Sequence, residues 1–314
     1  MKKSLVATVA CAVAVSLGMT SCKKEGIHIG VIQHVEHDAL NASYKGFVDA
    51  LKDAGYEDGK NIHIDYENAQ NDQSNNVTIA DKFANDNVDL ILAIATPSAA
   101  AAAARTEEIP ILVTAVTDPA DAKIVESNEK PGRNVSGTSD LTPVKQQMQL
   151  LKKLIPEAKK VGMLYCSGES NSFFQVGLAK KECDALGLSY VDATVSNSNE
   201  IQQVVEDLCH KVDVIYAPTD NMIASAMKNV SQLATENKIP VIVGEKGMVD
   251  NGGLATYGIN YYDLGVLTGK MAVRILKGES KPADMPIEYL EKFDLSINYE
   301  TAEKLGIEIP EELK

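Results

Sequence analysis

The chain has 314 residues, a formal net charge of −14 and a pI of about 4.9. This acidic balance argues against a nucleic-acid partner, because such proteins gain affinity from Lys and Arg side chains that contact phosphates. The sequence contains no Trp and only 5% aromatic residues, which leaves little to stack on bases. The length is sufficient for two domains, each with a core of its own.

Residues 1–21 are typical of an export signal. A positive start is followed by an apolar run over residues 5–18, which is too short to span a membrane. Small residues then precede Cys22, and this arrangement resembles the signal of bacterial lipoproteins, in which the cysteine is lipidated. We therefore expect cleavage before Cys22, a tether over residues 22–26 and a lipid anchor outside the cytoplasmic membrane. The alternative is an ordinary secretory signal with an incidental cysteine.

The first half of the remaining chain alternates between strand and helix patterns. We expect strands over residues 27–32 and 62–67 and a helix over residues 39–54 between them. A polar loop with two histidines and two acidic residues follows the first strand. Its spacing fits neither an HExxH motif nor an EF-hand, so we expect no metal site there.

Residues 88–105 form the most informative stretch. An almost continuously apolar strand ends at Thr96, Pro97 and Ser98, and six consecutive alanines follow. The pattern predicts a buried parallel strand that leads into a helix, with Thr96 as N-cap and Pro97 at the first helical position. The unpaired N–H groups and the dipole at such a helix start favour an anion such as a carboxylate.

The second half of the chain repeats this plan. Residues 212–222 again begin with Val-Asp, continue as an apolar strand and end in a polar turn. Each half also opens with a strand, a polar loop and a helix; in the second half we expect the polar loop over 167–172 and the helix over 173–186. The duplication predicts an α/β fold of two similar Rossmann-like lobes with parallel sheets, whose strands end at a common cleft.

We expect lobe 1 to contain residues 27–140 and 261–286, and lobe 2 residues 141–260 and 287–314. The chain would then cross between the lobes three times, near residues 138–142, 258–261 and 285–288. Three short crossings form a hinge at which a few loop residues absorb a rotation.

Several motifs extend over nearly the whole mature length and carry a family resemblance: HDALNASYKGF, ATPSAAAA, VTDP, GESNS, APTDN and ATYGINYYDLGVLTGKMAVRILKGE. With them the chain resembles the substrate-binding lipoproteins of ABC importers, which have the type I periplasmic-binding fold, and in particular the subgroup associated with tryptophan and tyrosine uptake. The resemblance implies a protein that closes around a small ligand and delivers it to an ABC permease and its ATPase. We also expect a monomer without a cofactor.

We expect the ligand to be an amino acid or similar zwitterion with an aromatic or apolar side chain. Thr96, Ser98 and the adjacent backbone would bind the carboxylate, and Asp220 would bind the ammonium, with Glu245 as a second candidate. The complete set of expected ligand-binding residues is Gln33, Thr96, Pro97, Ser98, Thr117, Asp118, Ser170, Asn171, Ser172, Asp220, Asn221, Glu245, Asn260 and Tyr261.

Other interpretations remain open. The same fold could bind a nucleoside, a sugar or another carboxylate, or could act as a ligand sensor. Sugar sites in such clefts usually stack on Trp or Phe, and only Phe173 and Phe174 lie near an expected cleft loop. An enzyme is disfavoured because the sequence has no GxSxG, P-loop, GxGxxG or HExxH motif. Thr96 and Asp220 could also serve only as helix caps.

Overall fold

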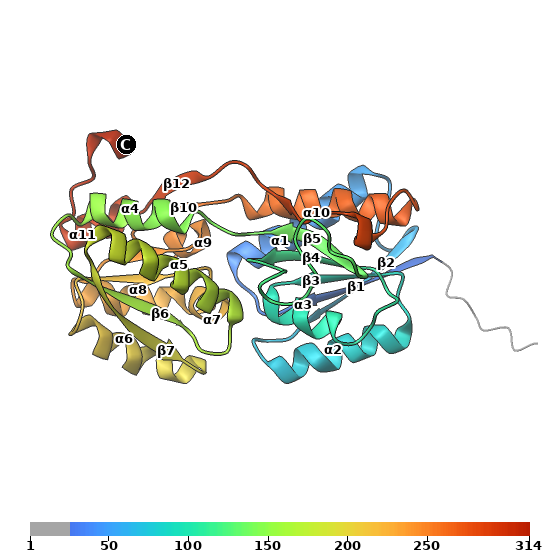
Figure 1. The fold of residues 1–314 in the computed structure, drawn as a ribbon, viewed down its shortest axis with the longest axis horizontal. Helices are drawn as coiled ribbons and strands as arrows, with labels where there is room; N and C mark the ends of the chain where they lie inside the picture. The colour runs from blue at the N-terminus through green and yellow to red at the C-terminus, as the bar shows by residue number, and fades with distance from the viewer. Residues whose placement is uncertain (1–25) are drawn as a thin grey trace, which may run out of the picture.

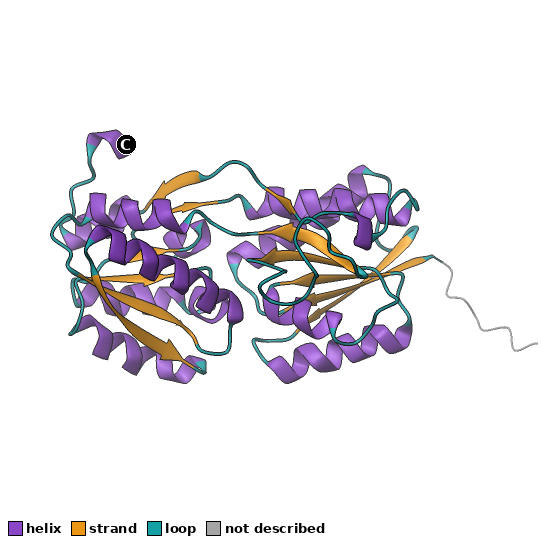
Figure 2. Ribbon diagram, viewed as in Figure 1, coloured by secondary structure: helices purple, strands orange, loops and turns teal. Residues whose placement is uncertain are grey.

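The computed structural model describes residues 26–314, so the predicted signal and Cys22 lie outside the described residues. The chain forms two lobes, each a six-stranded sheet with helices on both faces (Figures 1 and 2). This confirms the predicted fold of two similar α/β lobes.

In lobe 1 the strand order is β11-β5-β4-β3-β1-β2, and all neighbours pair in parallel. Helices α1 and α10 cover one face, and α2 and α3 cover the other. Its elements are β1 (Ile27–Gln33), α1 (Asp38–Asp53), β2 (Ile62–Asn68), α2 (Gln73–Asp86), β3 (Leu90–Ile94), α3 (Thr96–Ala103), β4 (Ile111–Val116), β5 (Val135–Ser139), α10 (Tyr261–Leu276), η2 (Pro282–Asp284) and β11 (Glu288–Tyr289).

In lobe 2 the order is β12-β10-β9-β8-β6-β7, and only β12 runs antiparallel to its neighbour among the described strands. Its elements are α4 (Val144–Leu154), β6 (Lys160–Cys166), α5 (Ser170–Leu186), β7 (Ser189–Val195), η1 (Ser198–Glu200), α6 (Ile201–Cys209), β8 (Val214–Ala217), α7 (Asn221–Ser225), α8 (Met227–Glu236), β9 (Val241–Val243), α9 (Lys246–Asp250), β10 (Ala255–Gly258), β12 (Asp294–Ile297), α11 (Tyr299–Leu305) and η3 (Glu311–Leu313).

The chain crosses between the lobes after β5, after β10 and between β11 and β12. The third crossing lies a few residues later than the expected 285–288, because β11 pairs with β5 and so still belongs to the sheet of lobe 1. All three crossings run along the same side of the molecule (Figure 1), as a hinge requires.

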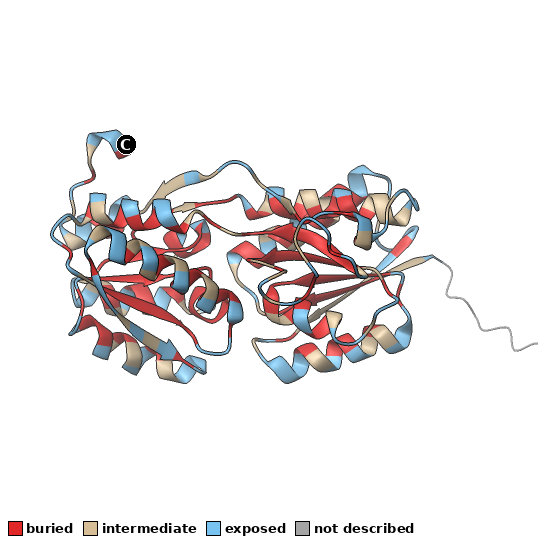
Figure 3. Cartoon of the chain, in the orientation of Figure 1, coloured by how far each residue is buried: buried red, intermediate tan, exposed pale blue. Residues whose placement is uncertain are grey.

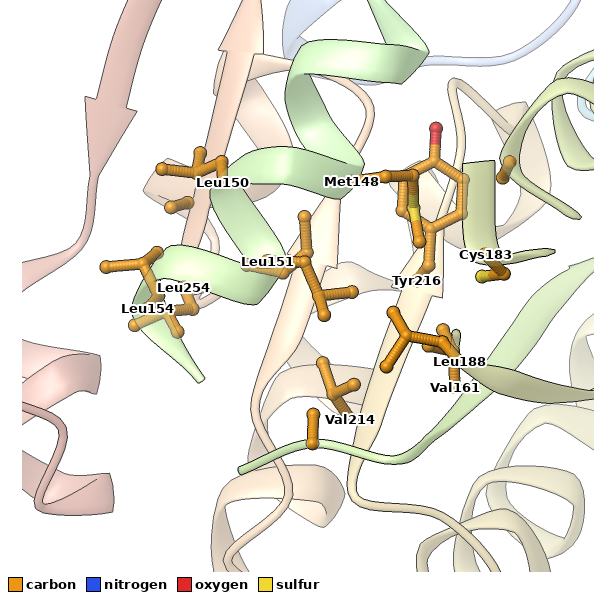
Figure 4. Packing of buried hydrophobic residues seen from close by; sticks show 14 of the residues in the cluster. Met148, Leu150, Leu151, Leu154, Val161, Cys183, Leu188, Val214, Tyr216 and Leu254 are labelled. Carbon is orange, nitrogen blue, oxygen red and sulfur yellow. The ribbon is translucent and has the colours of Figure 1, made fainter. Parts of the chain in front are cut away.

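The continuous apolar patterns correspond to strands covered on both faces. Every residue of β3 is fully buried, and Figure 3 shows the central strands of both sheets as the most buried part of each lobe. In lobe 2, Met148 and Leu151 of α4 pack beside Tyr216 of β8 (Figure 4). The Tyr216 hydroxyl donates to Gln147 Oε1 at 2.7 Å, which satisfies the one polar group of this side chain.

Helix α10 follows the second crossing directly and packs against α1 through glycines. A Cβ on Gly46 would lie 2.0 Å from the carbonyl oxygen of Tyr262, and one on Gly265 would lie 1.9 Å from that of Ser43. The two backbones therefore meet at a distance that no side chain permits. The Ser43 hydroxyl also donates to the carbonyl of Tyr261, so the second crossing is held firmly against lobe 1.

Candidate functional site

A narrow, partly open cavity lies between the lobes, where the carboxyl ends of the two sheets face each other. The empty space in and around it is about 290 Å³, part of which is open to solvent. Both lobes and the hinge contribute to its wall, which is formed by His37, Leu40, Ala115, Thr117, Asp140, Asn171, Thr219, Asp220, Asn221, Ala224, Glu245 and Tyr261.

The structure brings six of the fourteen predicted residues to this wall. They are Thr117, Asn171, Asp220, Asn221, Glu245 and Tyr261. The other eight do not line the cavity: Gln33, Thr96, Pro97, Ser98, Asp118, Ser170, Ser172 and Asn260. The wall also contains six residues that were not among the fourteen predicted ones: His37, Leu40, Ala115, Asp140, Thr219 and Ala224.

Local hydrogen bonding explains why several polar residues at strand ends face elsewhere. Asp118 Oδ1 accepts from the N–H groups of Ala120 and Asp121, so this carboxylate closes its own turn. The exposed Asn260 caps α10. Ser170 is also exposed, because α5 begins there and not at residue 173 as expected.

Three further predicted residues belong to networks behind the cavity wall. The Ser98 hydroxyl donates to Asn76 Oδ1 at 2.7 Å, and the Ser172 hydroxyl donates to Asp220 Oδ2 at 2.7 Å. Gln33 Nε2 donates to Asn41 Oδ1 at 2.7 Å. The polar groups of these side chains are therefore already paired within the protein and do not face the cavity.

The start of α3 differs from the prediction. Ala95, with φ of 80°, is the N-cap, and Thr96 is the first helical residue. No side chain caps this helix within the described structure, and the buried Thr96 Oγ1 has no hydrogen-bond partner there. The first backbone N–H groups of α3 therefore have no side-chain acceptor.

Asp220, the first candidate for binding an ammonium, already has partners for both oxygens. Its Oδ1 accepts from the N–H of Ile223 at 2.9 Å, which caps α7, and its Oδ2 accepts from Cys166 N at 2.6 Å and from the Ser172 hydroxyl. Burial raises the pKa of this carboxyl, and the nearby charge of Glu169 raises the pKa further. Its geometry is that of a helix cap.

Glu245, the second candidate, is used in the same way. Its oxygens accept from the N–H groups of Gly247 at 2.5 Å and Met248 at 2.9 Å, which caps α9. Burial raises the pKa of Glu245 to about 7. Both predicted ammonium ligands are therefore committed to helix starts in lobe 2.

A third carboxylate of the cavity wall, Asp140, was not among the predicted residues. It follows β5 at the first crossing, and its Oδ2 accepts from the hydroxyl of Tyr261 at 2.7 Å. Its Oδ1 is buried and makes no hydrogen bond of ordinary geometry. Burial raises the pKa of Asp140 to about 6, and the hydroxyls of Tyr261 and Thr117 oppose this rise. Because Tyr261 stands at the second crossing, this pair joins two of the three crossings directly beside the cavity.

Hydrogen bonds cross the cleft between the lobes. His37 Nε2 lies 3.3 Å from Asn221 Oδ1, Gln175 Nε2 donates to Thr117 Oγ1 at 3.3 Å, and an Asn251 amide donates to Asp38 at 2.8 Å. Burial lowers the pKa of His37 to about 4, so its imidazole is neutral. The lobes are thus in the closed arrangement around an acidic cavity whose wall contains no Lys or Arg among the described residues.

The buried titratable groups predict a pH dependence of stability. Burial raises the pKa values of Asp220 and Glu245 in the folded state, so the folded protein binds more protons than the unfolded chain, and stability falls as pH rises through about 7. His34 and His37, whose pKa values fall to about 4, act in the opposite direction, but only below their ordinary value of 6.5.

We therefore expect the melting temperature of the ligand-free protein to fall between pH 7 and pH 8.5, where His34 and His37 are largely neutral in both the folded and the unfolded state. Differential scanning calorimetry across this range measures it. A melting temperature that stays constant or rises over this interval would contradict the raised pKa values.

The family described as ABC transporter substrate binding protein matches residues 28–314. A protein named tyrosine-binding protein from Clostridioides difficile is 46% identical over 289 residues, which cover 92% of this chain and 83% of the relative. The match therefore includes both lobes and the hinge.

Two solved structures bear on the arrangement of the lobes. A Streptococcus pneumoniae protein solved in complex with L-Trp is 41% identical, covers 92% of this chain and 97% of its own, and superposes with a TM-score of 0.89. A ligand-free, open substrate-binding protein from Clostridium difficile is 49% identical, covers 91% and 96%, and superposes with a TM-score of only 0.69. The lower score despite higher identity agrees with the closed arrangement seen here.

Proposed function

Since this chain belongs to the family of ABC transporter substrate-binding proteins, a family of binding proteins and not of enzymes, we propose that it captures tyrosine or tryptophan between its lobes and delivers it to an ABC permease and its ATPase. The observation that carries the proposal is the free Oδ1 of Asp140 in a narrow, acidic cavity. The known ligands of the relatives, tyrosine by name in one and L-Trp in the other, support the aromatic class.

The ammonium of the ligand would bind to Asp140. A buried carboxylate with an unpartnered oxygen is unfavourable unless a cation approaches it. Asp220 and Glu245 have no such unused oxygen. Helix N–H groups occupy both oxygens of Glu245, and those of Asp220 accept from Ile223 N, from Cys166 N at the end of β6 and from the Ser172 hydroxyl. An ammonium would supply the missing donors and the opposite charge in one group.

The carboxylate of the ligand would bind at the start of α3. The duplicated strands align Thr96 of lobe 1 with Asp220 of lobe 2. In lobe 2 the helix start is neutralised by the carboxylate of Asp220 itself, whereas in lobe 1 Thr96 offers an unpartnered hydroxyl and no side chain caps the helix. A carboxylate from outside would complete lobe 1 as Asp220 completes lobe 2. Thr96 does not line the cavity in this arrangement of the lobes. Side chains of the cavity wall would therefore have to move for the ligand carboxylate to reach the start of α3.

Thr96→Val tests this placement, since it keeps the shape of the side chain and removes the hydroxyl. We expect about tenfold weaker binding of tyrosine by isothermal titration calorimetry, as for the loss of one hydrogen bond to a charged group. Thr78→Val, on the outer side of α2, removes a hydroxyl that bonds only to its own helix and serves as control. Equal affinities of the two variants for tyrosine would show that the ligand carboxylate does not bind at the start of α3.

We also propose that the mature protein is anchored to the membrane by a lipid on Cys22, which lies outside the described residues. The support is the sequence pattern of residues 1–22. The intact mass of the protein purified from membranes provides the test. If the mass shows no acyl chains, or if the protein is recovered only in the medium, the protein is secreted without a lipid anchor.

A ligand screen tests the proposed function. Thermal shift of residues 23–314 should show a higher melting temperature with tyrosine or tryptophan, because a ligand that binds only the folded protein stabilises it by mass action. Leucine, a nucleoside, glucose and myo-inositol complete the panel. A shift with a nucleoside or a sugar alone would leave the fold assignment intact and refute the amino-acid ligand.

A further inference from the structure

We infer that His37 is a specificity-determining residue, which selects ligands whose aromatic ring carries a hydrogen-bond donor. A phenol O–H or an indole N–H would satisfy it, and the plain phenyl ring of phenylalanine would not. The inference rests on the proposed function and extends it from an aromatic class to a rule within that class.

The first step concerns the orientation of the Asn221 amide. The Glu169 carboxylate, which is almost completely buried, accepts from Asn221 N at 3.0 Å and from Asn221 Nδ2 at 2.5 Å. Its other partners, Met222 N and Asn171 Nδ2, are also donors. A carboxylate surrounded only by donors can accept but not donate, so the NH₂ end of Asn221 must face Glu169. The oxygen of the amide then faces the opposite lobe.

The second step concerns the tautomer of His37. Asn221 Oδ1 lies 3.3 Å from His37 Nε2 and is an acceptor, so Nε2 must carry the proton. The imidazole is neutral because burial disfavours its charged form. Its Nδ1 therefore carries a lone pair. This atom is buried without a partner, although His37 occupies the N-cap position of α1, where a side chain could have bonded to the helix.

The third step places this acceptor at the ring end of the ligand. Leu40 follows His37 by one helical turn, and Ala224 follows Asn221 by one turn, so apolar side chains from both lobes flank the pair in the cavity wall. Asp140 and Tyr261 stand at the hinge crossings instead. An amino acid whose ammonium binds Asp140 can thus direct its ring between α1 and α7, toward His37.

The chain of hydrogen bonds from Glu169 through Asn221 to His37 also depends on closure of the lobes. His37 belongs to lobe 1, whereas Asn221 and Glu169 belong to lobe 2, so the contact that determines the tautomer exists only when the lobes meet. When the lobes are apart, Asn221 no longer fixes the tautomer of His37, so either ring nitrogen can be the acceptor. Recognition of the ring donor is therefore completed by the same motion that encloses the ligand.

Calorimetric titration of tyrosine, tryptophan and phenylalanine tests the inference. We expect the wild-type protein to bind tyrosine or tryptophan at least tenfold more tightly than phenylalanine, because phenylalanine leaves the buried acceptor unpaired. His37→Leu should remove most of this preference by weakening the donor-bearing ligand tenfold or more while leaving phenylalanine binding unchanged or stronger. His63→Leu, at a largely exposed histidine of β2, is the matched control.

Equal affinity of the wild-type protein for all three amino acids, or an equal loss for all three in His37→Leu, would overturn the inference and leave the proposed function standing. Failure of the wild-type protein to bind any aromatic amino acid would instead refute the proposed function. Nitrogen-15 NMR of the histidine rings gives a readout without a variant: the complex with tyrosine should show His37 protonated at Nε2. Protonation at Nδ1 would also overturn the inference.

Discussion

Replacing Asp140 by Asn should weaken the binding of tyrosine or tryptophan about 100-fold, the largest effect on binding that the site predicts. The substitution keeps the shape of the side chain, but the ammonium of the ligand then enters a buried cavity without its opposite charge. Isothermal titration calorimetry at pH 8 measures the loss, because burial raises the pKa of Asp140 only to about 6 and the wild-type carboxyl is then ionised.

Asp118→Asn is the matched control, since this aspartate also follows a strand of lobe 1 but bonds only within its own loop. Its affinity should stay close to that of the wild-type protein. The melting temperature of Asp140→Asn should change little, because an amide oxygen can still accept from the Tyr261 hydroxyl. If Asp140→Asn binds the ligand as tightly as the wild-type protein does, the ammonium must bind elsewhere, with Asp220 or Glu245 as the remaining candidates.

Gly265→Ala should cause the largest loss of stability among single methyl additions to the hinge region. The new Cβ would lie 1.9 Å from the carbonyl oxygen of Ser43, a backbone atom that cannot rotate away, so α1 and α10 must separate. We expect a loss of about 3 kcal/mol in the free energy of unfolding, at the upper end for an overpacked core. Urea denaturation followed by circular dichroism measures it.

Gly177→Ala makes the same chemical change in a different place. Gly177 lies in α5 on the surface, and a Cβ there would meet no atom within 4 Å. This variant should gain up to about 1 kcal/mol, because alanine favours the helix more than glycine does. Equal stabilities of the two variants would show that close packing of α1 against α10 does not stabilise lobe 1.

The two-lobed fold was accessible from the sequence because its signals are local and repeated. The apolar runs of β3 and β8 and the Val-Asp pairs before them are present in both halves, and their order alone indicates two α/β units. The third crossing was misplaced because β11 is only two residues long and belongs to lobe 1 through pairing with β5, which no local pattern reveals.

The site was less accessible, since a polar residue at a strand end has two possible roles. Asp118 and Asp220 look alike in sequence, yet one lies in its own turn and the other reaches the cavity as a helix cap. Asp140 follows the short polar strand β5, where no apolar run marks a strand end. His37 was seen only as part of a polar loop, and its pairing with Asn221 depends on closure between lobes.

The passage of the chain between lobes after β11 has a consequence for how the protein is made. One short stretch near the end of the chain supplies an edge strand to both sheets, β11 to lobe 1 and β12 to lobe 2. Neither lobe is therefore a contiguous fragment, and a nascent chain that stops before Glu288 lacks an edge strand in both lobes at once. Each half can reach its final form only after almost the entire polypeptide has left the ribosome.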